Sequence, residues 1–216
     1  MESQIGSKQS YVQHLIVFAI FLVISCIFCM PALQGYYLNQ HDMFTWLQGS
    51  AESRAYYDKT GEFAQWSNNM FGGMPLVATD NYPNGNWFHK LNHWFQFYTN
   101  GIPHNPIIFF MLSMIGFYLL SLSLNFNKWF GVIGGIAFAF STYNPIIIAA
   151  GHTTKMIDIA YLPAILAGVV YAYKGKYGLG IILVGIFLPM FIDTGHFQII
   201  YYGALVVVVM VVASRA

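Results

Sequence analysis

Long apolar runs separated by short polar turns dominate the chain. The first run, from Val12 to Met30, is apolar except for Gln13 and His14 at its start and Ser25 further on, and it ends at Pro31. Its length is close to the roughly 20 residues that a helix needs to cross the hydrocarbon core of a bilayer. Further apolar segments follow at 106–124, 129–150, 156–173, 178–192 and 197–213. The pattern predicts six membrane-spanning helices.

The connections between the later segments are very short: 125–128, 151–155, 174–176 and 193–196. Connections of this length place consecutive helices side by side and antiparallel. Segment 129–150 also contains three glycines, which permit close helix packing, and Pro145, which predicts a kink near one end of that span.

Composition supports a membrane protein. Charged residues make up 8% of the chain and hydrophobic residues 57%, whereas a soluble globular domain carries roughly 25% charged residues. The net charge of +1, without a basic run, offers nothing to nucleic acid. We therefore expect an all-α polytopic membrane protein, a single membrane domain over residues 1–216, with the lipid bilayer as its partner.

The one long connection, residues 31–105, holds five of the eight acidic residues. From Asp42 to Tyr57, apolar side chains recur at three- and four-residue spacing. This spacing predicts a helix with Asp42 at or near its N-cap and its end at Thr60-Gly61. Turns are expected near residues 67–69, 72–75 and 83–85, where Asn, Gly and Pro gather.

A second helix of this loop is expected from Trp87 onward. Its polar residues Lys90, Asn92 and Gln96 lie opposite the apolar face. The apolar face is mostly aromatic and consists of Trp87, Phe88, Leu91, Trp94, Phe95 and Tyr98. The pattern is typical of an interfacial helix lying on a bilayer. A helix buried under its own loop would show the same pattern.

The distribution of lysines predicts how the spans are oriented in the membrane. The turns 125–128 and 174–176 hold three lysines, whereas 151–155 and 193–196 together hold only Lys155. Cytoplasmic connections carry the excess of positive charge, so the N-terminus is expected in the cytoplasm. The long loop and both lysine-poor turns then share the outer side, together with most acidic and histidine residues. This asymmetry indicates a functional outer face.

Candidate chemistry gathers in that face. Asp42 is a candidate general base, because a carboxylate near low-dielectric surroundings can act as a base; its alternative role is a helix N-cap. His152 and Lys155 are candidates for holding a phosphate, with the lysine as a point charge. The alternative is a snorkelling lysine beside a capping turn. His196 and Gln198 begin the last span on the same side.

Two further groups leave their roles open. Asp158 lies just inside a span, where an ionisable residue is a functional candidate by default, although it could simply pair with Lys155. His41, His152 and His196 with Asp42 would make a nitrogen and oxygen ligand set, but their spacing matches no metal signature. No metal ligand is therefore assigned, and a divalent metal stays open as a cofactor. His89 and His93 lack the glutamate of the metalloprotease motif.

Several motifs carry a family resemblance. They are Gln40-His41-Asp42, Trp66 followed by Met70-Phe71-Gly72-Gly73-Met74-Pro75, Gly151-His152-Thr153-Thr154-Lys155 and His196-Phe197-Gln198. Over nearly all of residues 12–213 the chain resembles the N-terminal part of the bacterial YfhO-like membrane proteins, which belong with the GT-C glycosyltransferases. The stretches ending at Pro75 and Lys155 are the more specific ones.

The resemblance implies sugar transfer at the outer face of the bacterial inner membrane, from a polyprenyl-phosphate-linked donor to an unknown acceptor. It implies Asp42 as the essential acid of the first outer loop. Substrate and phosphate binding would then fall to His152, Lys155, His196, Gln198 and Trp66. The chain departs from the family in having no second acid beside Asp42. Family members are also far longer, so a fragment or a minimal relative is expected.

Two other functions fit the same sequence. A transporter or flippase of lipid-linked material would explain Asp158 and the proline-containing span. A non-catalytic membrane scaffold would explain a chain of only six spans.

Overall fold

The computed structural model describes residues 2–36, 38–76, 87–96, 98–99, 102–103 and 106–214. For residues 2–10, His93, Phe95, Gln96, 98–99 and 102–103 it describes the backbone alone. The predicted turn at 83–85 lies outside the described residues.

The described chain is almost entirely helical. Its helices are α1 (Glu2–Phe28), α2 (Met30–Leu33), α3 (His41–Gly49), α4 (Ala51–Thr60), α5 (Trp87–Gln96), α6 (Ile107–Ser123), α7 (Lys128–Ala139), α8 (Tyr143–Ala150), α9 (Thr153–Tyr173), α10 (Tyr177–Asp193) and α11 (Phe197–Ala213). Two antiparallel hairpins join β1 (Trp66–Ser67) to β2 (Met74–Pro75) and β3 (Tyr98–Thr99) to β4 (Ile102–Pro103). The first hairpin covers the two turns predicted near residues 67–69 and 72–75.

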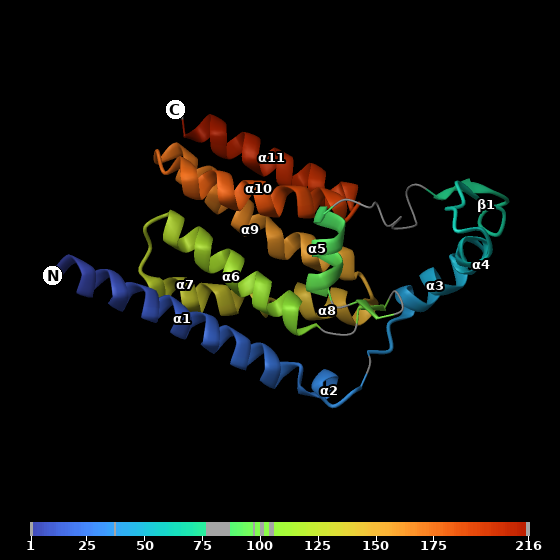
Figure 1. Cartoon of the computed structure of the whole chain (residues 1–216), viewed down its shortest axis with the longest axis horizontal. Coiled ribbons are helices and arrows are strands. Elements are labelled where there is room, and N and C mark those ends of the chain that lie inside the picture. Colours follow the sequence, from blue (N-terminus) through green and yellow to red (C-terminus); the bar gives the residue numbers. More distant parts are fainter. Residues whose placement is uncertain are drawn as a thin grey trace.

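The long helices run alongside one another (Figure 1). The first turn of α1 and the last turn of α11 lie at the same end of this layer, while α3, α4 and β1 extend from the opposite end (Figure 1). The turns before α9 and α11 also lie at that opposite end. The antiparallel arrangement expected from the short connections is thus confirmed.

Two described helices are long and apolar enough to cross a membrane by themselves: the Tyr11–Phe28 part of α1, and α9. The pair α7 and α8 passes the same test only as one span bent by 40°. Helices α6, α10 and α11 are apolar but have 17 residues each. The helical, apolar character is as expected, and the number of six spans stays a prediction.

Helix α9 lies at the centre of the packing, between α6 and α10. A Cβ atom on Gly116 of α6 would lie 2.7 Å from the carbonyl oxygen of Ala160 in α9. On the other side of α9, a Cβ on Gly180 of α10 would lie 2.9 Å from the carbonyl oxygen of Gly168. Small residues let helix backbones approach closely, so both contacts depend on glycine.

The segment 129–150 is bent by 40° at a break in the helix, so the predicted distortion is confirmed, but the break lies at residues 140–142, before Pro145. The helix stops at residue 139 and resumes at Tyr143, which places Pro145 in the first turn of α8. A proline is tolerated there because its missing N–H would have no partner within the helix. The side chain of Asn144 donates hydrogen bonds to the carbonyls of Phe138 (2.9 Å) and Ala139 (3.2 Å). It thereby satisfies carbonyls that the end of α7 leaves free.

The predicted helix from Asp42 to Tyr57 is two helices, α3 and α4, which meet at Ser50. Its predicted end is confirmed: Gly61 has φ +72°, and its N–H donates to the carbonyl of Tyr57 at 2.8 Å. Asp42 is not the N-cap, because Gln40 holds that position. Asp42 lies in the first turn, where a negative charge is favoured by the helix dipole.

We expect Gly116→Ala to lower the free energy of unfolding by about 1–3 kcal/mol, since the added methyl group meets backbone that cannot move aside. Denaturation of the purified protein in detergent measures this. The matched control is Gly185→Ala in α10, where a Cβ would meet nothing within 4 Å. Alanine there should be neutral or stabilising by up to about 1 kcal/mol. Equal effects of the two substitutions would contradict the close α6–α9 contact.

Candidate functional site

The structure joins two candidate residues from distant parts of the chain. Asp42, in the first turn of α3, places Oδ2 3.0 Å from Nε2 of His152, the residue at the N-cap position of α9. Their side chains are 43% and 47% exposed. An ion pair this exposed contributes little to folding stability. Both side chains are therefore open to a ligand at the protein surface.

A tight backbone contact brings this pair together. Gly151 ends α8 with φ +104°, and a Cβ atom there would lie 3.0 Å from the backbone nitrogen of Met43 and 3.2 Å from Cβ of Gln40. The buried side chain of Gln40 donates a hydrogen bond of 2.6 Å to the carbonyl of Ile148. The start of α3 is thus fixed against the end of α8. This contact places Asp42, in the first turn of α3, next to His152.

Lys155 and His196 share the electrostatic surroundings of His152. Lys155 is half-buried in the first turn of α9, and His196 precedes α11. Burial, and then the positive charges of Lys155 and His152, lower the pKa of His196 below 6.5. His196 is therefore neutral at physiological pH. Its Nε2 atom is buried and has no hydrogen-bond partner among the described residues.

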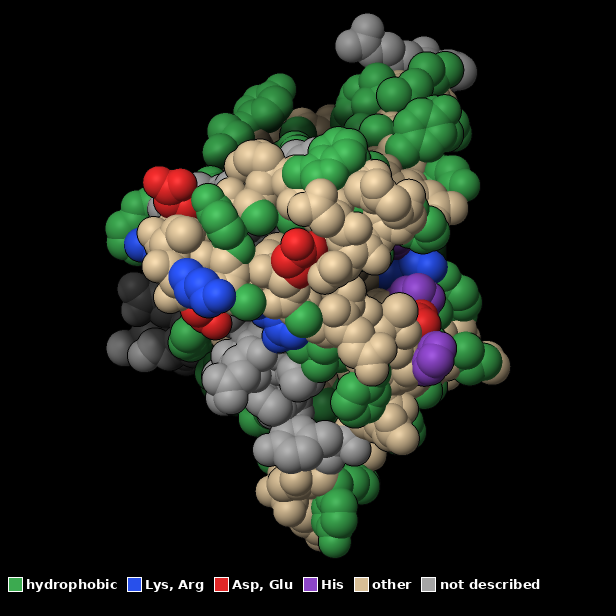
Figure 2. Space-filling model, turned by 90° about the vertical axis from the view of Figure 1, so that its right-hand side faces the viewer, with side chains coloured by type: hydrophobic (Ala, Val, Ile, Leu, Met, Phe, Trp, Pro, Cys, Tyr) green, Lys and Arg blue, Asp and Glu red, His purple; other side chains and the backbone are tan. Residues whose placement is uncertain are grey.

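The start of α9 is suited to an anion. The first N–H groups of a helix have no partner within it, and the helix dipole places partial positive charge there. Thr153, Thr154 and Lys155 occupy that first turn. Figure 2 looks onto this end of the molecule, where histidine, acidic and basic side chains gather in one area. The region combines one carboxylate with positive charge on Lys155 and the helix end.

The other two candidates are not joined to this group by any described contact. The amide of Gln198 lies 3.3 Å from the hydroxyl of Tyr202, on its own helix. Trp66 lies in β1, where a Cβ atom on Gly73 would come within 2.8 Å of its indole nitrogen. That hairpin extends from the helix layer together with α4 (Figure 1).

Asp158 is fully buried in α9, and its predicted ion pair with Lys155 is not formed. Neither carboxylate oxygen has a hydrogen-bond partner among the described residues. The hydroxyl of Thr194 lies near this carboxyl group. That hydroxyl, however, donates to the carbonyl of Phe191 at 2.9 Å.

Sequence patterns did not indicate the buried polar network around Asn92. This side chain is 4% exposed, and its amide nitrogen donates to the carbonyl of Met190 (2.8 Å) and to Oδ2 of Asp193 (3.0 Å). The hydroxyl of Tyr161 donates to its amide oxygen at 2.8 Å. The same Asp193 oxygen lies 3.2 Å from Nδ1 of His89. The side chain of Asn92 points into the protein instead of solvent, because buried carbonyl and carboxylate oxygens accept its hydrogen bonds there.

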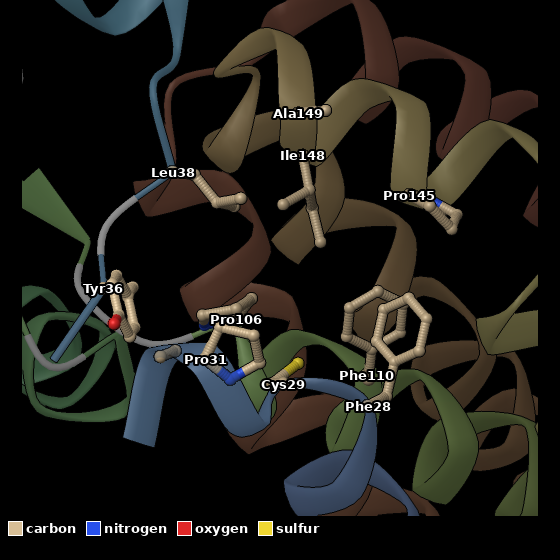
Figure 3. A pocket seen from close by; sticks show the side chains of 11 residues that line it. Phe28, Cys29, Pro31, Tyr36, Leu38, Pro106, Phe110, Pro145, Ile148 and Ala149 are labelled. Carbon is tan, nitrogen blue, oxygen red and sulfur yellow. The ribbon is translucent and has the colours of Figure 1, made fainter. Parts of the chain in front are cut away.

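An apolar cavity of about 230 Å³ lies beside the polar group. Its walls come from the end of α1, α2, the approach to α3, the start of α6 and α8 (Figure 3). Ile148 contributes its side chain to this cavity and its carbonyl to Gln40. Leu38 lines the cavity and stands four residues before Asp42 in the chain. The cavity is thus connected through short stretches of chain to the Asp42–His152 pair.

The metal-ligand set considered as an alternative is not assembled in the part of the chain that the structure describes. Among the described residues, no three His, Cys, Asp or Glu side chains lie close enough to share a metal ion. Of the four side chains proposed as ligands, Asp42 and His152 alone are joined by a described contact. The side chain of His93, the partner of His89 in the other arrangement considered, lies outside the described residues.

These features define a helical protein with helices able to cross a membrane and a polar group of side chains at one end. Comparison with protein-family models, curated proteins and solved structures finds no match for the chain. Its function therefore has to be inferred from its own residues.

Acid should destabilise the protein through His196. Because folding lowers the pKa of this imidazole below 6.5, the unfolded state binds the proton more readily. Stability is then lost as the pH falls through the unfolded value towards the lower folded one. We expect the thermal midpoint of the wild type to fall more than that of His196→Gln between about pH 7.5 and about pH 5. The exposed His41→Gln should behave like the wild type, and an equal fall in all three would contradict the assignment.

Proposed function

We propose that this chain carries the outer-face site of a GT-C-like membrane glycosyltransferase, which uses a polyprenyl-phosphate-linked sugar as donor. The observation that carries the proposal is the contact between Asp42 and His152, beside the basic groups Lys155 and His196. One carboxylate next to an anion-binding helix start is the equipment that sugar transfer from a lipid phosphate requires. The family resemblance of the motifs around these residues supports it.

The arrangement of the helices supports an outer-face location. The turn before α9, the turn before α11 and the start of α3 lie at one end of the helix layer (Figure 1). The lysine-rich connections 125–128 and 174–176 join helices at the other end. We place that lysine-rich end in the bacterial cytoplasm. The protein then has six spans, counting α7 and α8 as one, and a cytoplasmic N-terminus.

The site offers separate places for the two parts of such a donor. The phosphate would lie at the start of α9, with Lys155 as counter-ion and the N–H groups of the first turn as donors. The apolar cavity beside Ile148 would receive the part of the lipid chain nearest the phosphate, since an isoprenoid chain is excluded from water.

The chemistry follows from these positions. Asp42 accepts the proton of the acceptor hydroxyl as that oxygen attacks the anomeric carbon of the sugar. The bond between this carbon and the phosphate oxygen breaks, and polyprenyl phosphate leaves with the electron pair. Lys155 stabilises the negative charge on the leaving phosphate. His152 holds the Asp42 carboxylate in place through its 3.0 Å contact.

One observation favours a second function. A fully buried carboxylate without a hydrogen-bond donor, such as Asp158 in α9, is expensive in a membrane helix and is typical of transport pathways. A flippase or transporter of lipid-linked material would use that group and would not need Asp42 as a base.

We expect Asp42→Asn to reduce sugar transfer by about 100-fold or more, because the amide cannot accept the proton of the acceptor. The measurement is incorporation of labelled sugar by membranes that contain the protein and a polyprenyl-phosphate sugar. The control is Asp58→Asn, an exposed acid in α4, which should transfer at the wild-type rate. Movement of lipid across reconstituted vesicles that survives Asp42→Asn and stops in Asp158→Asn would establish the transporter instead.

Filling the apolar cavity should weaken donor binding. We expect Ala149→Phe, at a wall of the cavity, to raise the KM for the lipid-linked donor by about tenfold, since loss of a few buried apolar contacts is worth about 1–3 kcal/mol. The kcat should change less, because the substitution is remote from the anomeric carbon. The matched control, Ala204→Phe on the exposed side of α11, should leave both values unchanged. An unchanged KM for Ala149→Phe would exclude the cavity from the donor site.

A further inference from the structure

Helix α5 exposes one face and buries the other. Trp87, Trp94 and Phe88 are 82%, 63% and 38% exposed, although they are the largest apolar side chains of the helix for which the structure describes burial. Leu91 packs against the hydrophobic core, and Asn92 is 4% exposed. The aromatic face therefore points away from the protein. Leaving these large apolar side chains in water is unfavourable, because apolar surface is excluded from water.

The buried face is held at several points. Asn92 donates to Met190 and Asp193 of α10 and accepts from Tyr161 of α9. His89 contacts the same carboxylate of Asp193, which is only 7% exposed. A buried amide whose donor and acceptor groups all have partners holds its helix firmly in position. Helix α5 is consequently a rigid part of the helix layer, and its aromatic face has a defined direction.

The direction of α5 differs from that of the spans. It runs across α9 and α10 instead of alongside them (Figure 1), and it contacts α9 at Tyr161 and α10 at its end. If α9 crosses a bilayer, α5 lies along the membrane surface at the level where α10 ends. Indole rings favour the interface between hydrocarbon and water. The sequence of α5 contains no acidic residue, and the ammonium group of the exposed Lys90 lies 5.4 Å from the centre of the Trp87 ring.

We propose that α5 is an interfacial anchor that inserts Trp87, Phe88 and Trp94 into the headgroup region of an anionic bilayer. Lys90 contacts the lipid phosphates, which explains why the exposed polar position of this helix carries positive charge. The hydrogen bonds of Asn92 join the anchor to the end of α10, so the depth of α5 in the bilayer fixes the depth of that end. Asp193 and the turn that leads to His196 are thereby held at the membrane surface. This role does not depend on whether the protein transfers sugars.

The test uses the whole chain in vesicles of phosphatidylcholine and phosphatidylglycerol whose acyl chains are brominated close to the headgroup. Bromine quenches tryptophan fluorescence at short range. We expect Trp87→Phe and Trp94→Phe each to remove a clear part of the emission that the brominated lipid quenches. Trp66→Phe, in the hairpin that extends from the helix layer, should remove mainly emission that aqueous iodide quenches. The proposal is overturned if iodide, and not brominated lipid, quenches the emission lost in Trp87→Phe.

A second pair of variants tests the lipid charge. Lys90→Glu should abolish the rise in lipid quenching that phosphatidylglycerol produces in the wild type. Lys59→Glu, an exposed lysine at the end of α4, should leave that rise intact. Circular dichroism of each variant confirms that the helices have formed. An undiminished rise in Lys90→Glu would contradict recognition of anionic headgroups. Lipid quenching of Trp87 only after a second protein is added would assign the aromatic face to a protein partner instead.

Discussion

The contact between the start of α3 and the turn from α8 to α9 is the constraint on which the polar end of the molecule depends. It needs a glycine at position 151, because any side chain there would meet the backbone of α3. It also needs Gln40, whose amide satisfies a carbonyl at the end of α8. Without either residue, the start of α3 would not be fixed against the end of α8. The Asp42 carboxylate would then no longer be held beside His152.

Helix α9 carries the polar and charged groups that lie around this contact. Its N-cap residue His152 contacts the carboxylate, its first turn carries Lys155, and Asp158 is buried one turn further on. Tyr161, another turn along, holds α5 through Asn92. Packing between α6 and α10, with backbones brought close by glycine, keeps this helix from shifting. A single helix thus sets the relative positions of Asp42, Lys155 and α5.

The sequence predicted local features better than side-chain direction. The bounds of α11 and the stop at Gly61 follow from apolar length and from the left-handed conformation that glycine permits, so both were predictable. The gathering of polar turns at one end followed from short connections. The break between α7 and α8 was misplaced, because a proline signal cannot show whether the residue bends a helix or begins one.

The inward direction of Asn92 could not be predicted for a related reason. Helical periodicity assigns an amide to the polar face, yet Asn92 meets partners supplied by two helices, α9 and α10, that lie far away in the sequence. The contact between Asp42 and His152 was foreseeable only as a shared side of the membrane. Its short distance depends on tertiary packing, which no local pattern encodes.

The break between α7 and α8 gives the short helix α8 two attachments at opposite ends. At one end, Asn144 ties it to the last carbonyls of α7. At the other, Ile148 and Gly151 join it to the outer loop, while its Ile148 and Ala149 side chains form a wall of the apolar cavity. Helix α8 is therefore a shared support, fixed to α7 at one end and to the start of α3 at the other. The shape of the cavity and the position of Asp42 both depend on the placement of this one short helix.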